Sequence, residues 1–101
     1  MIRHIVMFQF KEEAEGRLKK ENVQITKDML DALPAKIPQI LSSQTAVNAK
    51  GADESNYDLL LITDFASLED LHTYIIHPDH KAVGAFMRPV RLSRTCIDIE
   101  I

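Results

Sequence analysis

Two segments of this chain, Ile2–Phe10 and residues 57–65, are rich in aliphatic and aromatic residues on both of their alternating faces. In the first segment, Val6 and Phe8 alternate with Ile5 and Met7, and in the second Leu59 and Leu61 alternate with Leu60 and Ile62. Strands with this pattern are covered on both sides of their sheet. A chain of 101 residues has room for one domain and one core, so a single sheet must find cover on both faces.

The intervening sequence predicts helices and weaker strands. Leu18, Ile25, Met29 and Leu33 share one helical stripe, which predicts a helix over residues 13–33 that Pro34 ends. Residues 40–49 are more polar and predict a strand near a sheet edge. The turn-forming residues 50–56 then lead into the strand 57–65.

The second half of the chain repeats a helix and a strand. Ser67 is a favourable N-cap for a second helix, and Pro78 disfavours helical geometry at His77. Residues 79–87 predict a short helical turn, and residues 90–99 a last strand. The order β-α-β-β-α-β predicts an α+β, ferredoxin-like domain over residues 1–101, with two helices on one face of a four-stranded antiparallel sheet.

This arrangement leaves the other face of the sheet bare. Ile5, Met7, Leu60 and Ile62 would lie there, and so large an apolar patch is unusual on a monomer. We therefore expect a homodimer in which two copies pack sheet to sheet about a two-fold axis.

Composition excludes several partners. The net charge of -3 argues against a nucleic-acid surface, and no stretch approaches the roughly 20 apolar residues that span a bilayer. Cys96 is the only cysteine, so no intrachain disulfide can form, and we expect it to be buried and inert. The N-terminus lacks the features of a secretory signal, so a cytoplasmic protein is expected. No membrane or nucleic-acid partner is predicted.

The run Tyr-Ile-Ile-His-Pro-Asp-His, from Tyr74 to His80, contains the side chains of this chain that are best suited to proton transfer. A histidine titrates near neutral pH and a tyrosine donates a hydrogen bond, so the run could supply a general base and its partner. Alternatively, the run is only the end of a helix, and its histidines are exposed to solvent. The spacing of the residues alone favours this second interpretation. If Tyr74 is buried, its hydroxyl needs a partner, and His80 is the nearest candidate.

Other polar residues have competing interpretations. His4 is either a satisfied core histidine or a cavity residue. A metal site of His4, His77, His80 and Asp79 fits no zinc spacing, so no metal is expected. Asp58 and Asp98 read as structural residues at strand ends. The arginines 88, 91 and 94 could attract an anionic ligand, although such clusters are more often solvated surface.

These segments together resemble one family. The matching residues are His4-Ile5-Val6-Met7-Phe8-Gln9-Phe10-Lys11, Ile37-Pro38, Tyr57-Asp58-Leu59, Phe65-Ala66-Ser67-Leu68-Glu69, Tyr74-Ile75-Ile76-His77-Pro78-Asp79-His80 and Asp98. They cover nearly the whole chain, which is similar to the stress-responsive dimeric α/β-barrel (Dabb) domain family. The resemblance implies the same ferredoxin-like dimer.

The resemblance also implies a chemistry. A few plant members are polyketide cyclases that close a ring by an aldol step without a cofactor, and distant relatives include cofactor-free monooxygenases. The base and the residue that assists at the carbonyl oxygen would fall on His80 and Tyr74. We therefore expect cofactor-free chemistry on a small hydrophobic carbonyl or aromatic metabolite. Its predicted contacts are His4, Val6, Phe8, Leu61, His77 and Val83.

The first helix departs from the cyclases, because it offers Val23, Ile25 and Met29 and no aromatic residue. The cyclase tunnel is therefore not expected to carry over. A non-catalytic, ligand-binding stress-response protein stays open as the alternative to an enzyme.

Overall fold

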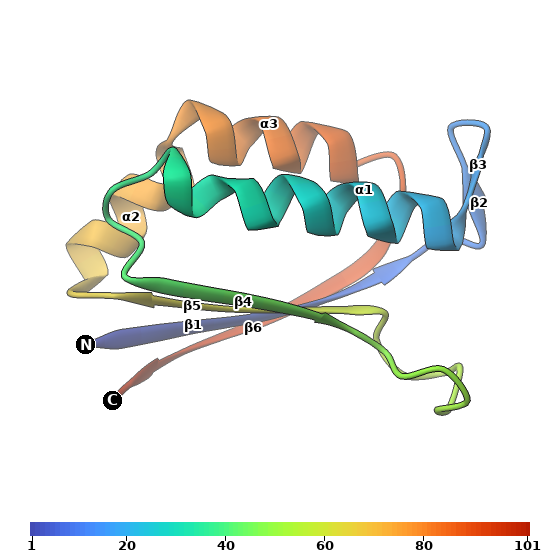
Figure 1. Ribbon diagram of the computed structural model, residues 1–101, viewed down its shortest axis with the longest axis horizontal. Coiled ribbons are helices and arrows are strands. Elements are labelled where there is room, and N and C mark those ends of the chain that lie inside the picture. Colours follow the sequence, from blue (N-terminus) through green and yellow to red (C-terminus); the bar gives the residue numbers. More distant parts are fainter.

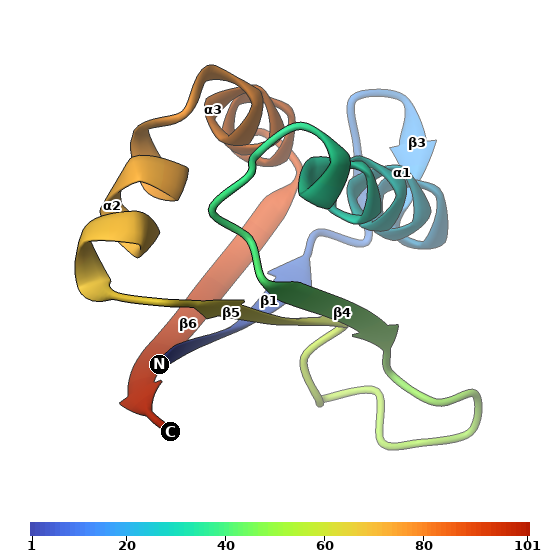
Figure 2. The ribbon, with the colours of Figure 1, turned by 60° about the vertical axis from the view of Figure 1, so that its left-hand side comes forward.

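The computed structural model describes residues 1–101 and forms a two-layer α+β domain (Figure 1). Strands β1 (Ile2–Phe10), β4 (Ser42–Val47), β5 (Leu59–Phe65) and β6 (Arg91–Glu100) pair antiparallel in the order β4-β5-β1-β6. The helices α1 (Lys19–Ala32), α2 (Leu68–Ile76) and α3 (Pro78–Met87) all lie on one side of this sheet (Figures 1 and 2). The predicted ferredoxin-like fold is confirmed, with β4 at an edge as expected.

Pro78 divides the second helical region into two helices. Residues 79–87 form most of a complete helix, α3, and not the single turn that the sequence predicts. Proline is favourable at the first position of a helix, because that position needs no intrahelical N–H donor. The same residue therefore ends α2 and begins α3.

The first helix begins later than predicted, at Lys19. Residues 13–18 instead form a small hairpin of β2 (Glu13–Ala14) and β3 (Arg17–Leu18). Glu15 and Gly16 have φ values of 55° and 74°, the left-handed conformation that a tight hairpin turn requires. The hairpin is tied to α1, because the Asn22 amide donates to the carbonyl of Ala14 and accepts from Arg17 Nε.

The buried stripe of α1 also differs from the predicted one. Asn22, Val23, Thr26 and Leu30 face the sheet, while Leu18 lies outside the helix and is 51% exposed. The buried face is rotated relative to the predicted stripe, of which only Leu33 is fully buried. Two of the residues that face the sheet are polar, and both are satisfied locally, since the Thr26 hydroxyl donates to the carbonyl of Asn22.

The core lies between the sheet and the helices. On β1 the helix-facing residues Ile2, His4, Val6 and Phe8 are buried, and a bulge between Gln9 and Phe10 shifts the pairing with β6. The helix-facing residues of β5 are buried as well: Leu59, Leu61, Thr63 and Phe65. Each strand therefore contributes one full face to the core, as the alternation in the sequence predicts.

The opposite side of the sheet carries no element of the chain (Figure 1). We define this open face by the apolar residues Ile5, Met7, Leu60, Ile62 and Ile97, which the strand register places side by side. Met7 is 37% exposed and Ile97 is 59% exposed. No helix of the structure is long and apolar enough to cross a membrane.

The helix-facing side of β6 is also open to solvent. Cys96, predicted to be buried, is exposed there. The reason is that β6 is an edge strand, so no further strand lies beyond it. Burial and the Asp98 carboxylate raise the pKa of Cys96, so the thiol stays protonated at neutral pH.

Candidate functional site

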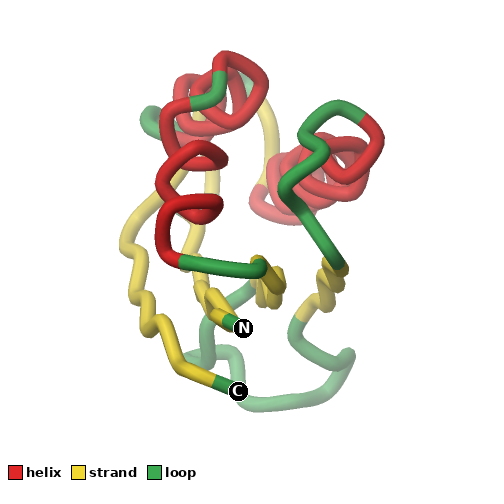
Figure 3. The backbone as a smooth tube through the Cα atoms, turned by 90° about the vertical axis from the view of Figure 1, so that its left-hand side faces the viewer, coloured by secondary structure: helices red, strands yellow, loops and turns green.

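Helices α2 and α3 follow one another directly and meet at a corner (Figure 3). The rings of Tyr74, in α2, and His80, in α3, pack together there. Ser67 caps the start of α2 by accepting a hydrogen bond from the N–H of Asp70. His77 ends α2 and is also the N-cap of α3, where its Nδ1 accepts from the N–H of Asp79 at 3.1 Å. His77 therefore orders the corner.

Tyr74 is the centre of an aromatic cluster. Its ring centroid lies 4.4 Å from that of His80, 5.0 Å from that of Phe65 and 6.2 Å from that of His4. Only 1% of Tyr74 is exposed. Burial raises the pKa of Tyr74 to about 12, so the hydroxyl stays protonated across the physiological range.

The expected hydrogen bond between Tyr74 and His80 is not made. The two rings pack at an interplanar angle of 55°, and Nδ1 of His80 pairs with the carbonyl oxygen of Ile75 at 3.0 Å. That expectation was wrong: the two rings pack against each other, and the hydrogen bond of the His80 ring goes to the Ile75 carbonyl. The Tyr74 hydroxyl is thus left as a donor without a partner in the chain.

His80 has the tautomer that a base requires. A carbonyl oxygen only accepts, so Nδ1 carries the proton and Nε2 carries the lone pair. Burial lowers the pKa of His80, partly opposed by the Ile75 carbonyl. The imidazole is therefore neutral at pH 7 and able to accept a proton at Nε2.

Asp98 on β6, for which the sequence predicts a structural role, holds the His4 side chain in place. Nδ1 of His4 lies 2.5 Å from Oδ1 of Asp98 and 3.6 Å from Sγ of Cys96. The His4 side chain is 4% exposed and the Asp98 side chain 37% exposed. The Nδ1–H donates to the carboxylate, which again leaves the Nε2 lone pair of a buried histidine free.

The sequence argues against a metal site of His4, His77, His80 and Asp79. The potential ligand atoms that converge in the structure belong to His4, Cys96 and Asp98 and lie within 4.8 Å of one another. Two ligands of one tetrahedral zinc ion lie about 3.3 Å apart, given bond lengths of about 2.0–2.1 Å. The 2.5 Å separation of His4 and Asp98 is therefore that of a hydrogen bond. The arrangement favours an oriented histidine over a metal ligand set.

The other predicted contact residues are apolar core residues. Val6, Phe8, Leu61 and Val83 are buried in the core. Their role as ligand contacts stays a prediction. Sequence reasoning missed Phe65, whose ring packs on Tyr74, although its place two residues beyond Thr63 on an alternating strand was a usable signal.

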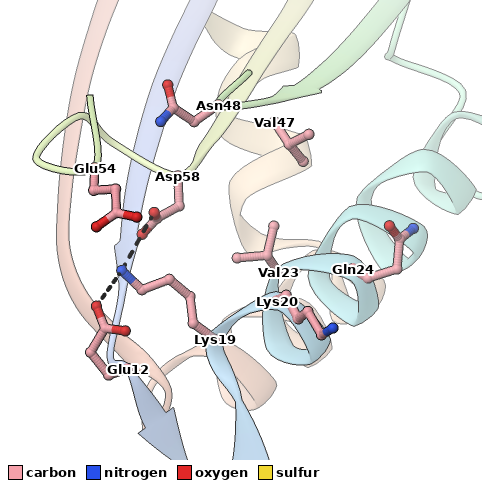
Figure 4. A pocket seen from close by; sticks show the side chains of 9 residues that line it. All are labelled: Glu12, Lys19, Lys20, Val23, Gln24, Val47, Asn48, Glu54 and Asp58. Atoms are coloured by element: carbon pink, nitrogen blue, oxygen red, sulfur yellow. Dashed lines mark ion pairs between the residues drawn. The ribbon is translucent and has the colours of Figure 1, made fainter. Parts of the chain in front are cut away.

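Three surface hollows lie away from the cluster, with volumes of about 410, 560 and 260 Å³. The second and third lie along the open face and β4, beside Met7 and Arg3 respectively. The first lies between the start of α1 and the loop before β5, at the far end of the sheet (Figure 4). Lys19 crosses it and pairs with Glu12 at 2.9 Å and Asp58 at 3.6 Å.

Asp58 also accepts a hydrogen bond from the N–H of Phe10 at 2.8 Å. This contact is consistent with the structural role predicted for Asp58. The hollow in Figure 4 is crossed by the ion pair of Lys19 and Asp58, which joins the start of α1 to the loop before β5. None of the three hollows is lined by Tyr74, His80 or His4.

Comparison with solved structures supports the fold. A dimeric protein with a ferredoxin-like fold from Bacteroides fragilis NCTC 9343 is 27% identical, with a TM-score of 0.82, covering 99% of this chain and 95% of that one. A dimeric ferredoxin-like protein from Thermobifida fusca YX is 26% identical, with a TM-score of 0.83 and coverage of 99% and 90%. Hydroxynitrile lyase from Passiflora edulis is 14% identical, with a TM-score of 0.78 and coverage of 99% and 92%.

At 14% identity the likeness to the lyase shows the fold alone. No curated protein matches the chain in sequence. The model of the stress-responsive A/B barrel domain matches residues 2–101, essentially the whole sequence. The chain belongs to the stress-responsive α/β-barrel, or Dabb, domain family.

Proposed function

We propose that this Dabb protein transfers a proton on a small, largely apolar carbonyl compound without a cofactor, with His80 as base and Tyr74 as hydrogen-bond donor. One observation carries the proposal. The Nε2 lone pair of His80 and the hydroxyl of Tyr74 are both free of partners in the chain, on rings whose centroids are 4.4 Å apart. A base and an acid are thereby held side by side without neutralising each other.

The chemistry needs both groups at once. Nε2 of His80 removes a proton from the carbon next to the carbonyl, and the electron pair of that C–H bond moves onto the carbonyl oxygen. The Tyr74 hydroxyl donates to the oxygen as the negative charge develops. The enolate then attacks an electrophile or takes the proton back. The apolar surroundings, including Phe65, strengthen the hydrogen bond to the oxyanion.

His4 belongs to the same cluster in this proposal. Asp98 fixes its tautomer, so that Nε2 of His4 is an acceptor for a hydroxyl or enol of the ligand. Its ring lies edge-on to Tyr74, with centroids 6.2 Å apart. His4 is thus a binding residue, and His80 the proton acceptor.

The dimer is part of the proposal. The structural neighbours from Bacteroides fragilis and Thermobifida fusca are described as dimeric, and this chain leaves an apolar open face on its sheet. We propose that two copies pack through that face. Sedimentation equilibrium of the whole protein tests this, and a monomer at micromolar concentration contradicts it.

The test of the reaction is α-proton exchange. The protein is incubated in deuterium oxide with acetophenone and cyclohexanone, and loss of the α-proton signals is followed by NMR. His80→Ala should lower the exchange rate by about 100-fold or more, the usual contribution of a positioned base. Tyr74→Phe should lower it by a similar factor, about 100-fold, as for a lost oxyanion donor.

His72 gives a matched control, because it is an exposed histidine of the same helix α2. His72→Gln should exchange at the wild-type rate, with an unchanged circular dichroism spectrum. Full exchange by His80→Ala would refute the assignment of the base.

The pH profile follows from the two pKa directions. The pKa of His80 is lowered, so activity should persist below pH 6.5, the ordinary histidine pKa, and fall only in more acidic solution. The pKa of Tyr74 is raised to about 12, so no basic limb is expected in the range where the protein is folded. A basic limb near pH 10 would show that Tyr74 is solvated.

A binding protein without turnover is the second candidate, and the burial of the cluster favours it. Tyr74 is 1% exposed and His4 3% exposed, so a ligand enclosed with them would exchange slowly. This candidate predicts a retained small molecule, identified by native mass spectrometry followed by denaturation, and no α-proton exchange. Ligand retention in His80→Gln would support it, and oxygen consumption with the retained ligand would instead indicate a monooxygenase.

A further inference from the structure

Arg94 lies at the solvent side of the cluster and has no acidic partner. The ion pairs of the chain involve other cations, such as Arg3 with Asp64 and Lys27 with Asp31, and none includes Arg94. Its side chain is exposed on the edge strand β6. A guanidinium without a carboxylate partner is suited to bind an anion.

The strand register places Arg94 beside the cluster. Arg94, Cys96 and Asp98 alternate along the helix-facing side of β6, opposite Phe8, Val6 and His4. Asp98 and Cys96 both contact Nδ1 of His4. They are exposed while His4 is buried, so β6 forms the solvent side of the cluster, and Arg94 extends that side by one position.

The charge of Arg94 reaches the reacting groups. It is the only charged group that lowers the pKa of Tyr74, and it also contributes to the lowered pKa of His80. The charge of Arg94 thus acts on both groups from β6, the strand that the register places beside His4. The same field would stabilise an anionic ligand at that place.

The acidic residue of this strand nearer to Arg94 is Asp98, and it does not cancel that charge. Asp98 is four positions from Arg94, a distance of about 13 Å along a strand at about 3.3 Å per residue. Its carboxylate is already engaged by His4. His80 is neutral at pH 7, as argued above, so it adds no competing charge. The edge of the cluster is therefore positive near Arg94 and negative near Asp98.

We propose that the site takes a carbonyl compound that also carries a carboxylate, with the carboxylate paired to Arg94 and the carbonyl oxygen directed to Tyr74. This rests on the proposed function and narrows its substrate class to keto acids. A guanidinium matches a carboxylate with two parallel hydrogen bonds. A phosphate is usually held by a glycine-rich loop or several backbone N–H groups, and the chain has no such loop.

The test compares each acid with its uncharged ester. Levulinate and para-acetylbenzoate, and their methyl esters, are titrated into the protein at constant ionic strength while the Arg Nε–H and histidine ring signals are followed by NMR. At least one acid should bind about fivefold more tightly than its ester, the size of a half-exposed ion pair. Its titration should shift the Nε–H signal of Arg94 and leave that of Arg91 in place.

Substitutions assign the preference. Arg94→Met should abolish the difference between acid and ester, and Arg94→Lys should retain part of it. Arg91→Met is the matched control, because Arg91 lies beyond the bulge, opposite Phe10, and should keep the full difference. Equal binding of acid and ester by the wild type, or no binding of either acid, would overturn the proposal.

Binding and exchange separate the two proposals. If Arg94 governs a preference for acids but no α-proton exchange occurs, the keto-acid site stands and the catalytic function fails. If exchange proceeds equally with acid and ester and is unchanged in Arg94→Met, the catalytic function stands and the role of Arg94 fails.

Discussion

The two faces of the sheet have similar sequences and different environments. On the helix-facing side Val6 is 1% exposed and Leu61 3% exposed, whereas on the open face Met7 is 37% exposed and Ile97 59% exposed. Both sets are apolar, so hydrophobicity alone does not distinguish a core from an interface. The difference arises because the chain has helices for one face only, and the other must be covered by something outside the chain.

The largest effect should come from a charge placed on each face in turn. Val6→Asp buries an unpaired carboxylate in the core and should cost more than about 4 kcal/mol, enough to unfold much of the protein. Met7→Asp, one residue along the same strand, should leave the secondary structure intact. Circular dichroism and urea titration compare the two, and equal destabilisation in dilute, monomeric protein would show that the faces do not differ.

A smaller contrast is expected from truncation of a leucine. Leu59 is 1% exposed, and Leu59→Ala should lower the free energy of unfolding by about 2–5 kcal/mol through lost contacts and a cavity. Leu60→Ala removes the same atoms from the open face and should cost less than about 1 kcal/mol where the protein is monomeric. A rise in the Leu60→Ala cost with protein concentration would sharpen the comparison, because it would measure the dimer.

Ile97→Lys tests the open face directly. It introduces a cation on each copy, and we expect the dissociation constant of the dimer to rise by about 100-fold, since like charges across an interface cost several kcal/mol. Sedimentation velocity over a dilution series measures it. Thr45→Lys, on the helix-facing side of the edge strand β4, is the control for added charge. Loss of dimer in both variants would locate the interface elsewhere.

The smallest effect concerns acid stability. Arg3 donates two hydrogen bonds to Asp64 at 2.9 and 3.0 Å, and this pairing lowers the pKa of Asp64. The pKa is lower in the folded state, so the stabilisation is present above the unfolded value of about 3.9 and is lost as pH falls through the folded value. Asp64→Asn should therefore flatten the dependence of Tm on pH below about 4, and Asp28→Asn, at an exposed position of α1, should not.

Much of the fold follows from the sequence, because the alternation in β1 and β5 and the proline at residue 78 are local signals. Local signals failed in two kinds of place: where the backbone adopts an unusual conformation, and where the pairing of distant strands determines exposure. The left-handed Glu15 produced a hairpin where a helix was predicted, and the exposure of Cys96 depends on its place on an edge strand.

The residues of the site also differ in how far the sequence predicts their positions. Tyr74 and His80 lie on either side of a recognisable helix break, so their proximity could be predicted. The bond from His4 to Asp98 joins residues 94 positions apart and depends on the pairing of β1 with β6. The role proposed for Arg94 depends on the same register. No spacing within the sequence carries that information.

His77 closes one helix and opens the next, and this gives the corner a mechanical meaning. Its backbone N–H bonds to the carbonyl of Tyr74, and its ring holds the N–H of Asp79, immediately before His80. Tyr74, the proposed donor, lies in α2, and His80, the proposed base, lies in α3. His77 is the single residue that joins these two helices. A transient opening between α2 and α3 would separate Tyr74 from His80. Hydrogen exchange at the amide of Asp79 should therefore report how often the two side chains are apart.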